Sequence, residues 1–157
     1  MMLSPHFSRE EFEQSATARA RGIQNIMPDA LVPAARALCV LLLEPIRAQC
    51  GGPIILSSGY RSRAVNRAVG SHDTSQHRRG EAADIVPLRT PGQAELARWI
   101  AASDLPFDQL ILEGYRRDDP HAGWIHVSHA VGRPQRRHIL TMTLAGHGPV
   151  YREGLPG

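Results

Sequence analysis

The stretch 70–84 contains the residues best suited to chemistry, with His77 and Asp84 seven positions apart. A neutral imidazole and a carboxylate are both good ligands for first-row metal ions. Gly80 interrupts the segment between them, which favours a loop that leads into a strand. Alternation after Gly80 places Asp84 on the same strand face as the small Ala82, which leaves room for an ion. Taken alone, such a pair is more often a hydrogen-bonded turn than a metal site.

A third candidate ligand lies in the segment 123–128, which reads Gly-Trp-Ile-His-Val-Ser. Its alternation predicts a short strand with two aliphatic residues on one face and His126 on the other. Two imidazoles and one carboxylate form the three-ligand set that catalytic zinc uses, with the fourth position left to water. The sequence therefore predicts one Zn²⁺ ion held by His77, Asp84 and His126.

These residues also form a longer pattern, Ser75-x-His77-x-x-Gly80-x-Ala82-x-Asp84 followed by Trp124-x-His126. The pattern resembles the M15 peptidase family of zinc D-Ala-D-Ala carboxypeptidases and L-alanyl-D-glutamate endopeptidases, which is related in fold to the Hedgehog signalling domain. The segments 57–62, 65–66 and 107–113 are similar to the compact, often phage-encoded branch of that family. The resemblance extends from about residue 7 to about residue 128.

The resemblance implies an α+β fold, in which a small antiparallel sheet carries a zinc cleft and packs against N-terminal and crossover helices. The 157 residues, with 42% hydrophobic content, suffice for one folded core and leave no room for a second domain. We expect a mainly helical part over 1–50, a metal-site core over 53–143 and a tail over 144–157.

Local signals place helices and strands around the candidate ligands. A capping box formed by Ser8 and Glu11 predicts a helix over 8–19, and Pro45 should kink a longer helix over 31–49. Thr90 and Pro91 are typical of the N-cap and first residue of a further helix. The other expected elements are a buried strand over 53–57, a helix over 62–69, an antiparallel hairpin of 107–113 with 123–128, and a strand over 137–143.

The resemblance also assigns roles to residues of the expected cleft. By itself, Arg61 would be read as a solvated surface arginine. It matches the family arginine that meets a carboxylate or carbonyl oxygen of the substrate, a role that suits a rigid, permanently charged guanidinium. The expected substrate-binding residues are Arg61, Tyr60, Ser75 and Gln109, and the expected catalytic residues are Glu113, His121 and Arg61. Alternation over 107–113 should place Phe107, Gln109, Ile111 and Glu113 on one face.

The general base is the point at which the chain departs from much of the family. Many relatives carry an acidic residue three positions before the last metal ligand, where this chain has Gly123. Some place a histidine two positions before that ligand, where this chain has Trp124. We therefore favour Glu113 as the base and His121 as an oxyanion or proton-transfer partner. The aspartates at 118–119 are the alternative, as solvated turn residues that reach the site.

Two classes of function follow from the resemblance. The first is a zinc peptidase that cuts peptidoglycan stem peptides, as a D,D-carboxypeptidase or an L-alanyl-D-glutamate endopeptidase, in a phage or prophage murein hydrolase. The second is a zinc-stabilised binding or structural module of the same fold. Both need the ligand triad. Arg61 and Glu113 favour the enzyme, whereas Gly123 favours the module.

Charge and cysteine content indicate which partners and which cellular compartment to expect. All 18 basic residues are arginines, but the net charge is only +3, so we expect no nucleic-acid partner. Cys39 and Cys50 lie about three turns apart in one expected helix, too far for a disulfide, and reduced thiols indicate a reducing compartment. No signal peptide or membrane-length apolar run is visible. We expect a monomer made in the bacterial cytoplasm that reaches the cell wall by phage lysis or in a virion.

Overall fold

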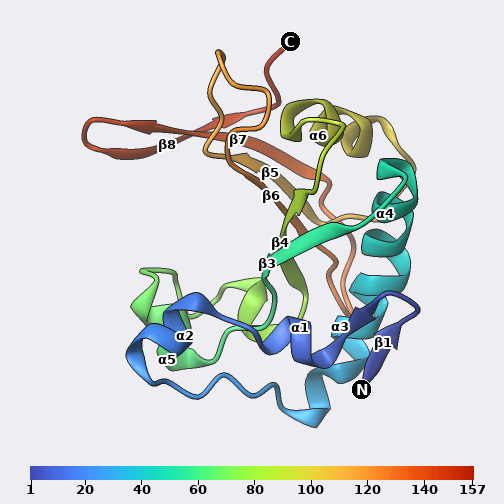
Figure 1. The fold of residues 1–157 in the computed structure, drawn as a ribbon, viewed down its shortest axis with the longest axis vertical. Helices are drawn as coiled ribbons and strands as arrows, with labels where there is room; N and C mark the ends of the chain where they lie inside the picture. The colour runs from blue at the N-terminus through green and yellow to red at the C-terminus, as the bar shows by residue number, and fades with distance from the viewer.

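The computed structural model describes all 157 residues, which are organised around a six-stranded sheet (Figure 1). Its strand order is β3-β4-β6-β5-β7-β8. The strands are β3 (Ile54–Ser58), β4 (Ala82–Pro87), β5 (Gln109–Glu113), β6 (Trp124–Ser128), β7 (His138–Ala145) and β8 (Gly148–Glu153). Strand β5 runs parallel to β7, and the other neighbours are antiparallel. The sheet is therefore mixed, which corrects the expectation of an antiparallel sheet.

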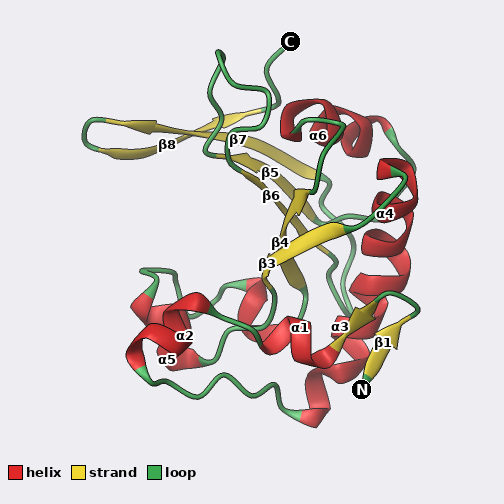
Figure 2. Cartoon of the chain, viewed as in Figure 1, coloured by secondary structure: helices red, strands yellow, loops and turns green.

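Helices and a small second sheet lie along one side and at the ends of this large sheet (Figure 2). The helices are α1 (Arg9–Glu13), α2 (Ala16–Arg21), α3 (Val32–Leu38), α4 (Glu44–Cys50), α5 (Arg63–Ala68) and α6 (Gln93–Ala102), and the small sheet pairs β1 (Met2–Ser4) with β2 (Phe7–Ser8). Helices α1, α2 and α5 gather at one end of the large sheet, away from α6 (Figure 1). None of the helices has the length and apolar character needed to cross a lipid bilayer.

The hydrophobic core lies between one face of the large sheet and helices α3, α4 and α6. A single cluster of 22 buried residues joins these helices to alternate residues of the strands, among them Ile85, Leu110 and Ile125. Burying one such aliphatic side chain contributes roughly 1.5–3 kcal/mol. The intervening strand residues, including Asp84 and His126, point to the opposite face, so burial of the core fixes the direction of the candidate ligands.

The helix expected over 31–49 is present and ends at Cys50, after which Gly51 adopts a left-handed conformation. Between α3 and α4 lies a π-helical turn, Cys39–Leu43, which closes with a bond from the Glu44 N–H to the Cys39 carbonyl. Pro45 follows this turn and has no N–H with which to continue the α-helical pattern. The irregularity in this helix is therefore a π-helical turn just before Pro45, where a kink was expected. Both cysteines are free thiols, as predicted.

The helix expected over 8–19 is instead two short helices. Ser8 and Glu11 form the predicted capping box at the start of α1. Gln14 is extended, and the Ser15 hydroxyl accepts a bond from the Ala18 N–H (3.1 Å) as the N-cap of α2. Serine competes in this way for backbone donors that a continuous helix would use, so the helix stops and restarts.

A tertiary contact sets the start of α6, which begins at Gln93 with Gly92 as its N-cap rather than at Thr90 and Pro91. The Gln93 N–H donates to the carbonyl of Pro120 (3.0 Å). A Cβ atom at position 92 would collide with that carbonyl oxygen. The helix entry therefore depends on a loop almost 30 residues away in the sequence, which local signals do not report.

Two strands also differ from expectation. Strand β3 lies at the sheet edge with Ile55 48% exposed, which corrects the expectation of a buried strand. Strand β5 begins at Gln109, so Phe107 does not share the face of Gln109. Phe107 is fully buried in the core, and its N–H is bonded to the Leu105 carbonyl (2.9 Å).

The segment expected as a tail, 144–157, contains a strand. The strand expected over 137–143 is present as β7, and β8 folds back on it as an antiparallel hairpin with Met142 opposite Tyr151. Gly148, the first residue of β8, has a φ of 123°, a conformation open to glycine. The hairpin extends beyond the body of the sheet (Figure 1).

Candidate metal centre and cleft

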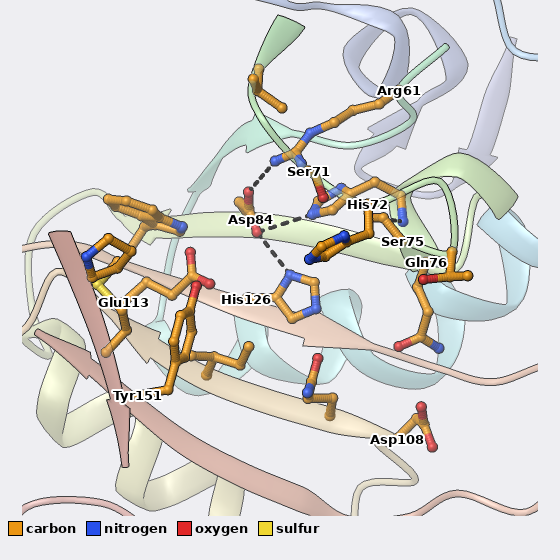
Figure 3. A pocket seen from close by; sticks show the side chains of 18 of the residues that line it. Arg61, Ser71, His72, Ser75, Gln76, Asp84, Asp108, Glu113, His126 and Tyr151 are labelled. Carbon is orange, nitrogen blue, oxygen red and sulfur yellow. Dashed lines mark hydrogen bonds and ion pairs between the residues drawn. The ribbon is translucent and has the colours of Figure 1, made fainter. Parts of the chain in front are cut away.

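Three structural elements bring the predicted ligands together. His77 lies on the 3₁₀ turn Gln76–Arg79, while Asp84 and His126 lie directly opposite each other on β4 and β6. Asp84 Oδ1 lies 3.3 Å from His77 Nε2 and 3.1 Å from His126 Nδ1. The three potential ligand atoms all lie within 4.8 Å of one another, and the three residues are buried. Figure 3 shows the His126 imidazole turned toward the Asp84 carboxylate.

The hydrogen bonds of His77 set its tautomer. Its Nδ1 lies 2.7 Å from the Gly59 carbonyl, which can only accept, so Nδ1 carries the proton. Burial lowers the pKa of His77 and favours the neutral imidazole. Nε2 then turns a lone pair toward the Asp84 carboxylate, 3.3 Å away. The Nε2 lone pair and the carboxylate oxygen are both hydrogen-bond acceptors, and a cation bound between them would satisfy both. These atoms therefore fit the ligand set of a metal ion.

Gly59 contributes to this tautomer by its lack of a side chain. A Cβ atom at this position would lie 2.8 Å from the Phe12 backbone Cα. The close approach is held by a bond from the Tyr60 N–H to the Phe12 carbonyl (2.8 Å). The turn after β3 is thereby held against α1, with its carbonyl at the His77 ring.

Arg61 holds the second oxygen of the aspartate. Its Nη2 donates to Asp84 Oδ2 (3.0 Å), and its Nε donates to the Ser58 hydroxyl (3.0 Å). Burial alone would raise the pKa of Asp84, but the neighbouring imidazoles of His77 and His126 outweigh it and keep that pKa well below its ordinary value. Asp84 is therefore an ionised ligand whose Oδ1 faces both histidines.

The triad lies in a cleft of about 1130 Å³. Glu113 reaches into the cleft from β5, next to the strand that bears His126. Burial, and then the charge of Asp84, raise the pKa of Glu113 above its ordinary value. A carboxylate with a raised pKa beside a candidate metal centre is suited to general base catalysis.

The other predicted site residues are divided between the cleft and its surroundings. Ser75 and Gln109 line the cleft together with Arg61. Tyr60 is 6% exposed and packs in the hydrophobic core, so it does not line the cleft. His121 is exposed and does not line the cleft, because its N–H is bonded to Asp119 and its carbonyl to Gln93.

The structure also explains why glycine occupies position 123. Gly123 has a φ of 75° and packs so closely on the Glu113 carbonyl that any Cβ atom would overlap it. An acidic side chain cannot be accommodated there without moving the β5–β6 connection. Asp118 and Asp119 lie in that connection and do not line the cleft. Glu113 is the carboxylate that the fold places beside the triad.

Two groups of residues that line the cleft were not among the predicted site residues. The arginines Arg79, Arg133 and Arg136 line the cleft along with the predicted Arg61. Residues of the β7–β8 hairpin line it as well, namely Met142, Leu144, Pro149 and Tyr151. The alternation of β7 is visible in the sequence, but nothing there indicates that β8 returns over the site.

A buried two-histidine, one-aspartate group in an open cleft, with a carboxylate beside it, has the features of a metal-dependent hydrolase. The model of the peptidase M15 family matches residues 5–128, and the chain belongs to this family. Membership indicates a metallopeptidase. No curated protein matched the sequence. The family match ends at the last residue of β6, so the β7–β8 hairpin lies outside it.

Proposed function

We propose that the chain is a zinc-dependent peptidase that hydrolyses peptidoglycan stem peptides, as a D,D-carboxypeptidase or an L-alanyl-D-glutamate endopeptidase, in the service of a phage or prophage. The observation that carries the proposal is the convergence of His77, Asp84 and His126 in a cleft that also contains Glu113. Two imidazoles and one carboxylate suit Zn²⁺ and leave a position for water.

The surrounding side chains supply the remaining chemistry. When bound, the metal ion supplies Lewis acidity and an acidified water. Glu113 accepts a proton from the attacking water and returns it to the leaving amine. Arg61 fixes Asp84 through one nitrogen and directs its remaining N–H groups to a substrate carboxylate. Gln109 and Ser75 line the cleft and hydrogen-bond the peptide.

The arginines of the cleft supply donors for an acidic peptide. Arg61, Arg79, Arg133 and Arg136 line it, each already paired with Asp84, Glu81 or Asp108, so a substrate carboxylate would use the N–H groups that these pairs leave over. Stem peptides carry free carboxylates on several residues, and complementary charge orients and attracts them. The volume of about 1130 Å³ is at the upper end of small-ligand sites, which suits a peptide of several residues.

Incubation with defined muropeptides, followed by mass spectrometry, tests this function. Zinc-loaded protein should release D-alanine or split the peptide after L-alanine, and the product distinguishes the two specificities. Chelator and the His126→Ala variant are the negative controls. No metal-dependent mass change with any stem peptide, in protein that demonstrably binds zinc, would reject the hydrolase.

A non-catalytic, zinc-stabilised module of the same fold is the second candidate. Gly123 favours it, since the acid found there in many relatives is missing. If the protein is such a module, the metal ion should stabilise the fold and no substrate should be turned over. The Glu113→Gln variant would then bind a muropeptide as the wild type does, and neither protein would change it.

A further inference from the structure

The β7–β8 hairpin adds a row of side chains to the catalytic face of the sheet. Register pairs Trp124 of β6 with Glu113, Glu113 with Met142 of β7, and Met142 with Tyr151 of β8. Residues paired across neighbouring strands share a face. All four line the cleft. Tyr151 therefore projects from the same face as Glu113, two strands away and outside the family-matched segment.

The phenol of Tyr151 is directed at the centre of the site. In Figure 3 its ring extends from β8 toward the Glu113 carboxylate and the His126 imidazole. Tyr151 is 51% exposed, and its partial burial, followed by the nearby charges of Glu113 and Asp84, raises its pKa above the ordinary value of 10. No hydrogen bond to another protein group contributes to that shift. The hydroxyl is thus protonated at neutral pH and free to donate.

The donors expected for the oxyanion are otherwise engaged or displaced. Arg61 is tied to Asp84 and Ser58, and Figure 3 shows it on the other side of the triad from Tyr151. His121, expected as an oxyanion or proton-transfer partner, is exposed and outside the cleft. Among the residues of β5, β6 and β8 that line the cleft, Tyr151 is the one with a hydroxyl.

We propose that Tyr151 is a catalytic residue whose phenolic O–H donates a hydrogen bond to the scissile carbonyl oxygen as that oxygen becomes an oxyanion. The assignment rests on the proposed hydrolase function. When the water oxygen bonds to the carbonyl carbon, the C=O π pair moves onto oxygen and Glu113 takes the water proton. Tyr151 keeps its own proton throughout. On collapse the C–N bond breaks, and Glu113 returns the proton to the amine.

The test compares Tyr151→Phe with Tyr115→Phe, which removes the same atom from a half-buried tyrosine that packs against the core and does not line the cleft. Zinc-loaded wild type and both variants are assayed on muropeptides for kcat and KM. Zinc stoichiometry is measured on each. Calorimetry then measures binding of the phosphinate analogues of D-alanyl-D-alanine and L-alanyl-D-glutamate, whose tetrahedral oxygens mimic the oxyanion.

Tyr151→Phe should lower kcat by about 100- to 1000-fold, with KM and zinc content near wild type. Its affinity for the phosphinate that the wild type binds should fall by at least about 10-fold, and Tyr115→Phe should change neither quantity. Equal kcat and equal phosphinate affinity in Tyr151→Phe and wild type would overturn the role of Tyr151 alone. An inactive wild type would overturn the hydrolase. If the wild type is inactive, phosphinate binding still tests the Tyr151 contact. Equal affinity in Tyr151→Phe and wild type, or no binding by either protein, rejects the contact. A loss of affinity in Tyr151→Phe but not in Tyr115→Phe supports it.

Discussion

Replacing Glu81 by glutamine should destabilise the domain, because this residue ties the metal-bearing turn to the chain after β6. Glu81 is 3% exposed. Its carboxylate accepts hydrogen bonds from Gln76 Nε2 (3.0 Å) and from Arg133 Nη1 (3.1 Å) and Nη2 (2.6 Å). Burial alone would raise the pKa of Glu81, but the bonds from Arg133 and Gln76 outweigh it and lower that pKa. The ionised group therefore joins His77's turn to residue 133.

The magnitude follows from what Glu81→Gln leaves unpaired. The amide turns an N–H₂ donor toward the Arg133 guanidinium, so donor faces donor. Breaking a buried ion pair costs about 3–5 kcal/mol. The Arg133 side chain is 41% exposed and can be rehydrated, which reduces the cost to about 2–3 kcal/mol. For a chain of this size each kcal/mol lowers Tm by about 2–4 °C, so the expected fall is about 5–10 °C.

Thermal unfolding of metal-free protein at pH 7, followed by circular dichroism, measures this effect. The matched control is Glu95→Gln, an identical change at an exposed position of α6, which should shift Tm by no more than about 1–2 °C. If Glu81→Gln has the same Tm as Glu95→Gln, the ion pair does not hold the turn, and our account of how His77 is positioned is wrong.

Four further outcomes follow from the structure. Glu113→Gln should slow hydrolysis by about 100- to 10,000-fold at unchanged zinc content, as measured by single-turnover kinetics and elemental analysis; full turnover would exclude this base. His126→Ala should weaken zinc binding by about 100-fold or more in a chelator competition while circular dichroism stays native-like, and unchanged affinity would disprove the metal centre. Gly59→Ala should lower the free energy of unfolding in urea by about 1–3 kcal/mol, since its Cβ atom would lie 2.8 Å from a backbone atom of Phe12; wild-type stability would show that the turn can shift. Burial would raise the pKa of Asp108, yet the bonds from Arg136 outweigh it and lower that pKa below its ordinary value of 3.8, so the pair stabilises the fold above about pH 4 and this contribution is lost as the pH falls further. The stability gap between wild type and Asp108→Asn should therefore close during acid titration of metal-free protein, and a constant gap would contradict the linkage.

The sequence alone determined the candidate ligands and the elements that bear them. His77, Asp84 and His126 were identifiable because metal ligation requires particular side chains, and because alternation along a strand reports which face a residue occupies. The capping box at Ser8 was visible for a similar reason, since it depends on only a few neighbouring residues.

Contacts between distant segments decided the rest. The start of α6 depends on the Pro120 carbonyl, and the proton on His77 Nδ1 depends on the Gly59 carbonyl. His121 lies outside the expected site because its backbone is bonded to Asp119 and to Gln93. Tyr151 entered the cleft because β8 pairs with β7. Such placements depend on sheet order and register, which arise from packing of the whole core and leave no signal in a short stretch of sequence.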